Sequence, residues 1–111
     1  MIENDLQAQV IEYIKSRGFK YRHKGYRGKP GRGHSKNDDG WPDLEILIPG
    51  AKTIFIELKV DNNTLSEMQI EIKLELQMMS FSVYECRTFE KCVECIEHEE
   101  RKNTYYGLNN G

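Results

Sequence analysis

The stretch Thr53-Ile54-Phe55-Ile56-Glu57-Leu58-Lys59-Val60 decides how this chain folds. A β-strand points successive side chains to opposite faces, so the aliphatic residues at alternate positions from Ile54 to Val60 are expected to face a core together. Glu57 and Lys59 then project side by side from the other face. The eight residues therefore predict a core strand that carries a carboxylate beside an ammonium group.

A second carboxylate, Asp43, comes just before residues 44–48, which read as another strand. If Asp43 opens that strand, its carboxylate can meet that of Glu57, and two hard oxygen ligands a few ångströms apart suit Mg²⁺ or Mn²⁺. Lys59 beside such a metal can position a water molecule. The pattern predicts a metal-dependent phosphodiesterase.

The strands are expected to form a mixed sheet. The turn-forming residues 49–52 favour a hairpin between strands at 44–48 and 54–60. Residues 81–86 read as a further core strand, and a short extra strand is possible near 19–22. Because a helix separates 54–60 from 81–86, a crossover joins these two strands, which favours an α/β sheet flanked by helices.

Helical spacing predicts a first helix at about 3–17 and a closing helix at about 88–99, and Thr64 with Glu67 can form the capping box of a helix between them. The helices complete the order helix, strand, strand, helix, strand, helix. Glu3 falls on the apolar side of the first helix, so it is a candidate for the acidic site. The alternative is that Glu3 only decorates the first turn, where acidic residues suit the helix dipole.

The central helix has two apolar strips. The broader strip is expected to face the core, and Gln69 at its edge can reach the strand that carries Glu57, although a plain helix-flank glutamine fits equally well. The narrower strip would be exposed in a monomer, which favours a homodimer contact. The broader strip contains Leu65, Met68, Ile72, Leu76 and Met79, and the narrower one Ile70, Leu74 and Met78.

The net charge is only −2, but positive charge is concentrated in one segment. Nine of the sixteen basic residues lie between Lys15 and Lys36, with no acidic residue among them. The Gly-rich, aperiodic part at about 24–40 favours a basic loop that orders on nucleic acid, while a solvated flexible loop is the alternative. Its glycines do not form a phosphate-binding P-loop, so no nucleotide cofactor is expected. The candidate nucleic-acid contacts are Lys24, Arg27, Lys29, Arg32 and Lys36.

The length of 111 residues, with 38% hydrophobic and 31% charged, fits one domain. We expect residues 1–102 to form it and 103–111 to be a frayed tail. No stretch approaches the roughly 20 apolar residues of a membrane span, and the N-terminus lacks a basic-then-apolar signal, so a cytoplasmic protein without membrane contact is expected.

The three cysteines also favour a reducing compartment, because an odd number cannot all pair within one chain. The spacing of Cys92, Cys95 and His98 is reminiscent of a zinc motif. On a helix, however, His98 lies on the side opposite Cys92. Buried free cysteines, Cys86 included, are therefore expected rather than a zinc site.

Taken together, these residues resemble the virus-type replication-repair nucleases, the VRR-NUC branch of the PD-(D/E)XK superfamily. The likeness rests on Glu3, the run Gly40 to Leu44, the run Phe55 to Lys59, and Leu65-Ser66 with Gln69. It implies a restriction-endonuclease-like α/β core. It also implies that Asp43, Glu57 and the backbone carbonyl of Leu58 hold Mg²⁺ or Mn²⁺, that Lys59 lies near the attacking water, and that Glu3 and Gln69 complete the catalytic site.

The same resemblance implies a biological setting. Stand-alone members of this size resemble phage-type proteins that dimerise and cut branched DNA such as four-way junctions, in replication, recombination or repair within a bacterial or phage-infected cell. Two alternatives remain open: a nuclease for flapped or single-stranded DNA or for RNA, and a nucleic-acid-binding module without catalysis. The basic segment from Lys24 to Lys36 leaves the substrate shape undetermined.

Overall fold

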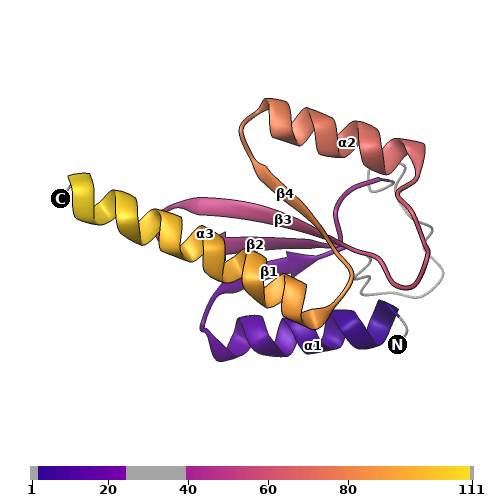
Figure 1. The fold of residues 1–111 in the computed structure, drawn as a ribbon, viewed down its shortest axis with the longest axis horizontal. Coiled ribbons are helices and arrows are strands. Elements are labelled where there is room, and N and C mark those ends of the chain that lie inside the picture. The colour runs from indigo at the N-terminus through magenta and orange to yellow at the C-terminus, as the bar shows by residue number, and fades with distance from the viewer. Residues whose placement is uncertain (1–2, 25–39, 111) are drawn as a thin grey trace.

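The computed structural model describes residues 3–24 and 40–110, with side chains for 5–24 and 40–102. The element order agrees with the predicted one, and the optional strand near residues 19–22 is present as β1 (Figure 1). The elements are α1 (Glu3–Ser16), β1 (Lys20–His23), β2 (Leu44–Ile48), β3 (Lys52–Leu58), α2 (Glu67–Met78), β4 (Ser82–Cys86) and α3 (Phe89–Asn110).

The four strands form one mixed sheet in the order β1-β2-β3-β4. β1 and β2 are antiparallel, β2 and β3 form the expected antiparallel hairpin, and β3 and β4 are parallel. Gly50 in the hairpin turn has a φ of 102°, a conformation that glycine adopts without steric cost. Helix α2 is the crossover between the two parallel strands, as their parallel pairing requires (Figure 1).

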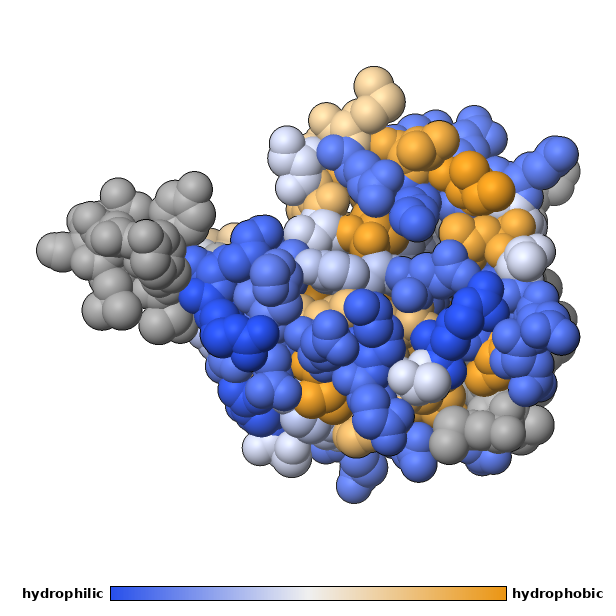
Figure 2. All heavy atoms as spheres, in the orientation of Figure 1, coloured by the Kyte–Doolittle hydropathy of each residue, from blue (hydrophilic) through white to orange (hydrophobic). Residues whose placement is uncertain are grey.

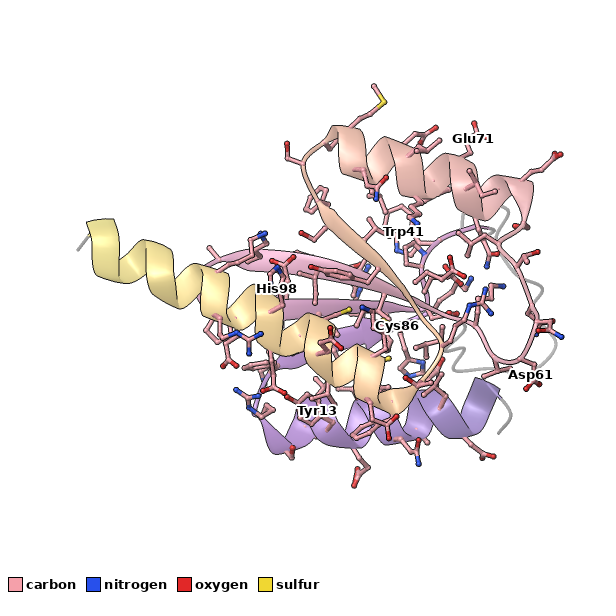
Figure 3. All side chains as sticks on the ribbon, viewed as in Figure 1. Tyr13, Trp41, Asp61, Glu71, Cys86 and His98 are labelled. Atoms are coloured by element: carbon pink, nitrogen blue, oxygen red, sulfur yellow. The ribbon has the colours of Figure 1, made fainter. Side chains whose placement is uncertain are left out.

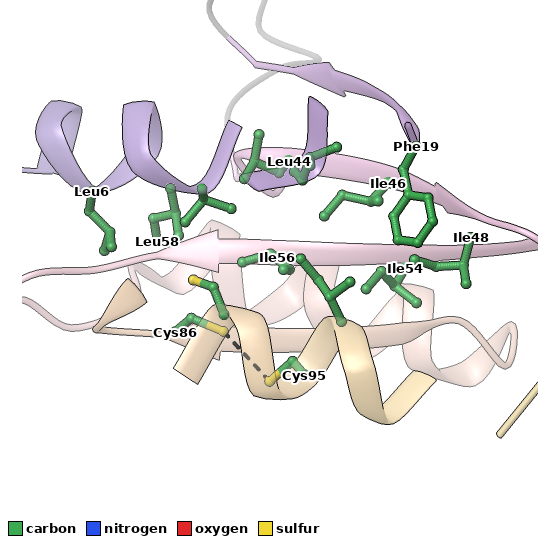
Figure 4. Close-up of a cluster of buried hydrophobic side chains, with 14 of the residues drawn as sticks. Leu6, Phe19, Leu44, Ile46, Ile48, Ile54, Ile56, Leu58, Cys86 and Cys95 are labelled. Carbon is green, nitrogen blue, oxygen red and sulfur yellow. Dashed lines mark hydrogen bonds between the residues drawn. The ribbon is translucent and has the colours of Figure 1, made fainter. Parts of the chain in front are cut away.

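The larger core lies between the sheet and the helices α1 and α3 (Figure 4). The alternate residues of β3 point into it as predicted, and each is fully buried. Burial of these aliphatic side chains contributes most of the driving force for folding, at about 25 cal/mol per Å² of apolar surface. The fully buried aliphatic residues are Leu6, Val10, Ile14, Leu44, Ile46, Ile54, Ile56, Leu58 and Ile96.

A smaller core lies on the other face of the sheet, under α2. It consists of Phe55, Leu76 and Val83, with Trp41 and Ile72 packed against it (Figure 3). Because both faces of β3 are covered, this strand is buried along most of its length. A polar side chain on the α2 face of β3 is therefore withdrawn from water.

The start and the packing face of α2 differ from the sequence-based predictions. Ser66, not Thr64, caps the helix, and Gln69 completes the capping box in place of Glu67. Within the expected core strip Leu76 is buried and Leu65 and Ile72 are half-buried, whereas Met68 and Met79 are exposed. The reason is that α2 packs on the β3–β4 half of the sheet, which is too narrow to cover its whole apolar strip.

Other boundaries also differ. β3 begins and ends two residues earlier than the predicted 54–60, since the hairpin ladder already pairs Lys52 with Ile48. α3 continues to Asn110, so the predicted end near Glu99 was wrong. Arg17, directly after α1, donates to both carboxylate oxygens of Glu100, at 2.5 and 2.6 Å, and this contact holds α3 to the end of α1 beyond the predicted end of α3.

The inner side of α3 carries a buried carboxylate, Glu99. The hydroxyl of Tyr84 donates to its Oε1 at 2.6 Å, and Lys52 Nζ lies 3.1 Å from its Oε2. Burial alone would raise the pKa of Glu99, but hydrogen bonds from Tyr84, Ser82 and Lys52 outweigh it and lower the pKa to about 2. This cluster attaches α3 to the beginnings of β3 and β4.

The cysteines are free and buried, as expected, and Cys86 Sγ lies 3.8 Å from Cys95 Sγ (Figure 4). Burial raises the pKa of Cys95 to about 12, so it stays a neutral thiol at pH 7. His98, labelled on α3 in Figure 3, is exposed, whereas Cys92 is buried. In the part of the chain that the structure describes, no helix is both long and apolar enough to cross a bilayer.

Candidate active site

Two carboxylates meet where β2 and β3 come together. The hairpin register pairs Leu44 with Ile56, so Asp43, one residue earlier, lies opposite Glu57, one residue later. Strand alternation points both away from the larger core, toward the α2 side. Their exposed fractions are 8% and 5%. The backbone N–H of Leu58 donates to Asp43 Oδ2 at 2.7 Å and holds that carboxylate against β3.

The proximity of the carboxylates changes their protonation. Burial, then the charge of Asp43 and a hydrogen bond with it, raises the pKa of Glu57 to about 9. Lys24 and Lys59 lower it in part. Without a cation, Glu57 therefore keeps its proton at neutral pH. A buried pair of this kind, which needs a proton or a positive ion between its oxygens, is typical of functional sites.

Two lysines flank the acidic pair. Lys59 follows Glu57 by two residues, directly after β3, and its charge acts on the Glu57 carboxylate. Lys24 Nζ lies 3.9 Å from Asp43 Oδ1, and the Lys24 backbone N–H donates to the carbonyl of Asp43 at 2.8 Å. Sequence analysis placed Lys24 only in the basic loop, whereas the structure brings it to the acidic pair by extending the β1–β2 ladder.

Gln69 connects the first turn of α2 to Glu57. Its Nε2 donates to Glu57 Oε1 at 2.9 Å, so the amide does reach the strand. Its Oε1 accepts the backbone N–H of Ser66 at 2.8 Å, and Ser66 Oγ accepts the backbone N–H of Gln69 at 3.2 Å. Because the capping box occupies the amide oxygen, the amide NH₂ must face Glu57.

Gly40 and Trp41 fix the loop that delivers Asp43. Gly40 has a φ of +80°, and a Cβ there would lie 2.7 Å from the carbonyl oxygen of Met68 in α2. Only glycine therefore allows the loop and α2 to approach this closely. The Trp41 ring packs edge-on against Phe55, with centroids 5.7 Å apart, beneath α2 (Figure 3).

Some of the predicted site residues lie outside the described part of the chain. They are the side chain of Glu3 and the loop residues Arg27, Lys29, Arg32 and Lys36. Among the described side chains, no three His, Cys, Asp or Glu residues gather as a metal-binding group. Asp43 and Glu57 still suit Mg²⁺, which commonly uses one or two carboxylates and keeps several water ligands.

The parallel register also places a residue that sequence analysis did not consider. Glu85 of β4 pairs with Glu57, but its carboxylate accepts a hydrogen bond from Arg87 at 2.6 Å. Glu85 is thus neutralised beside the acidic pair. Strand alternation in β4 predicts which face of the sheet Glu85 lies on. That Glu85 neighbours Glu57 follows only from the register between β3 and β4, which α2 and the core determine.

The raised pKa of Glu57 predicts how the stability of the metal-free protein depends on pH. The folded state keeps a proton that the unfolded chain releases above the ordinary pKa of 4.5, so the free energy of unfolding should fall as the pH rises from about 5 to about 9. Denaturant titrations across this range should show a flatter profile for Glu57→Gln than for Glu12→Gln, a change at an exposed carboxylate on α1. Equal slopes would contradict the protonated pair.

Ser66 should be required for the start of α2. Ser66→Ala removes the oxygen that caps the helix and should lower the free energy of unfolding by about 1 kcal/mol. Ser66→Thr retains a capping hydroxyl and serves as the matched control. Urea denaturation of the three proteins measures the difference, and an alanine variant as stable as the wild type would show that the capping box does not anchor Gln69.

Comparisons with known proteins bear on the fold. No model of a known protein family matches the chain, and no curated protein matches it. A solved structure described as a VRR_NUC domain is similar, with a TM-score of 0.66 and 24% sequence identity over 86% of this chain and 95% of the other. The restriction-endonuclease-like α/β fold implied by the resemblance is thus confirmed: the chain has the fold of a VRR_NUC domain.

Proposed function

We propose that the chain is a divalent-metal-dependent nuclease of the VRR-NUC type that hydrolyses DNA phosphodiester bonds. The observation that carries the proposal is the buried pair of Asp43 and Glu57, with lysines on both sides. Burying two adjacent carboxylates is unfavourable for folding, so their presence calls for a cation that the folded protein binds. The similar fold of a VRR_NUC domain agrees with this reading.

Asp43, Glu57 and the backbone carbonyl of Leu58 would hold Mg²⁺ or Mn²⁺. The bound ion supplies Lewis-acid charge for a phosphodiester oxygen and a more acidic water. Asp43 is already oriented by the N–H of Leu58, and Glu57 by the amide of Gln69, so the ligands are preorganised. Glu57 must lose its proton when the ion binds.

Lys59 would orient the attacking water and stabilise charge that develops on the phosphate. Gln69 would keep one oxygen of Glu57 engaged and leave the other for the ion. Glu3 is proposed as the acid from the first helix that completes the site. Beyond the described residues, Arg27, Lys29, Arg32 and Lys36 would contact the substrate backbone together with Lys24.

A binding module without catalysis accounts less well for the site. Carboxylates beside a phosphate backbone weaken binding, so a pure binder gains nothing from Asp43 and Glu57. Branched DNA, such as a four-way junction, is our proposed substrate. Flapped or single-stranded DNA and RNA are the alternatives, because the chemistry acts on any phosphodiester and the loops set the substrate shape.

Isosteric changes of the acidic pair should abolish cleavage. With Mg²⁺ or Mn²⁺, Glu57→Gln and Asp43→Asn should lower the rate by about 10³-fold or more, since each removes a metal ligand, while DNA binding stays equal or becomes tighter. Gel assays on duplex, flapped and four-way-junction DNA and on RNA measure this, with Glu12→Gln as the control and Lys59→Ala as a further test. Full activity of Glu57→Gln would sink the metal assignment.

We also propose a homodimer formed through α2. Ile70, Leu74 and Met78 are 45%, 54% and 86% exposed and form one strip along the helix. Figure 2 shows apolar side chains gathered over α2 at the surface. A second copy would cover this strip, because monomers seldom leave such a surface in water. Two active sites in one dimer would suit paired cuts across a symmetric junction.

A charge in the strip should separate the copies. Leu74→Glu is expected to turn a dimer into a monomer in light-scattering measurements, because the interface would have to bury an unpaired carboxylate. Leu47→Glu makes the same chemical change at an exposed position on β2 and should leave the dimer intact. A wild type that is monomeric at all concentrations would refute the dimer.

A further inference from the structure

Two cations of β1, and a third directly after it, face the same side of the sheet as the acidic pair. Lys20, Arg22 and Lys24 alternate with Tyr21 and His23. Tyr21 packs against the core under α1 and α3, and its ring stacks with that of His23, at a centroid distance of 6.4 Å. Strand alternation therefore points the three cations to the α2 side.

Helix α2 does not cover this half of the sheet. It packs on β4 and on Phe55 of β3, at the opposite edge from β1 (Figure 1). In the described part of the chain, Lys20 is exposed, the side chain of Arg22 is 81% exposed, and Leu47 of β2 is 49% exposed on the same face. Among the described residues, the β1–β2 half of the face is thus open to a ligand.

The row of cations leads to the acidic pair. The ladder runs from the pair of Lys20 with Leu47 to the pair of His23 with Leu44, and one more pair brings Lys24 beside Asp43. Asp43 in turn lies opposite Glu57. Side chains two residues apart on a strand are about 6.6–6.8 Å apart. This step is similar to the distance between consecutive phosphates of an extended nucleic-acid strand.

The described side chains neutralise little of the positive charge of Lys20 and Arg22. Arg22 meets Glu45 at 3.4 Å, but an ion pair with so exposed an arginine contributes little. Lys20 makes no ion pair with the described side chains. Lysines on an edge strand also discourage pairing with other chains. Preventing such pairing, however, would not explain why the row of cations leads to the buried carboxylates Asp43 and Glu57.

We propose that Lys20, Arg22 and Lys24 form a track for the sugar-phosphate backbone of a nucleic acid, which leads along β1 to Asp43 and Glu57. This inference rests on the proposed nuclease function and adds the path by which the substrate enters the site. Positive charges at phosphate spacing give affinity without base contacts, which suits a protein that reads the shape of its substrate.

The test is the salt dependence of binding. The double variant Lys20→Gln/Arg22→Gln loses two cations of the track, while Lys24 is kept because it touches Asp43. The control Lys91→Gln/Arg101→Gln loses the same charge from exposed positions on α3, on the other face of the sheet. Dissociation constants are measured for a duplex and a single strand at several salt concentrations, without divalent metal. A thermal melt of each variant checks its folding.

Log affinity falls as log salt concentration rises, and the track variant should make this slope less steep by about 1.8 on duplex DNA and about 1.4 on a single strand. The control should keep the wild-type slope. The single variants, should the double one unfold, are each expected to show half of this change. With metal present, the loss of cleavage should appear as a raised KM.

Two results would overturn the track: a wild-type slope in the double variant, or an equal decrease in the control. In either case, wild-type cleavage of DNA with Mg²⁺ would leave the nuclease proposal standing. If the wild type cuts no substrate, the nuclease proposal fails, while the slopes still decide whether β1 binds a nucleic-acid backbone.

Discussion

The rest of this structure depends on one constraint, which is that the carboxylates of Asp43 and Glu57 lie next to each other and are almost fully buried. Two carboxylates so placed repel each other, and burial raises the pKa of Glu57 to about 9. The aliphatic core behind β2 and β3 holds the two strands in the register that causes this meeting. The core on one face of the sheet thus stabilises an unfavourable contact between two carboxylates on the other face.

Helix α2 serves the site through its first turn rather than through its apolar face. The capping box that starts the helix also orients the amide of Gln69 toward Glu57. Gly40 allows this turn to lie directly on the loop before Asp43. The exposed apolar strip of α2, which contains Ile70, Leu74 and Met78, is then available for the proposed contact with a second copy. The same short helix therefore connects the geometry of the site to the proposed assembly of two copies.

The two edges of the sheet differ in charge and in how far they are covered. At the β4 edge, Glu85 is neutralised by Arg87, and α2 covers the neighbouring apolar residues. At the β1 edge, Lys20 and Arg22 are exposed, and no part of α2 covers the face. A polyanion approaching the acidic pair would be repelled least from the β1 side. Among the described residues, this asymmetry makes the β1 side the more favourable approach for the proposed substrate.

The sequence by itself determined the order of the elements, the two faces of β3 and the position of Glu57 and Lys59 on one of them, because strand alternation and helical spacing are local. It predicted Thr64 as the helix cap, which was wrong, because Ser66 with Gln69 fits the same local pattern and the cap at Ser66 is the one that lets Gln69 reach Glu57. Only the tertiary structure brought Lys24 to Asp43 and Glu85 to Glu57, because strand register depends on how distant segments pack.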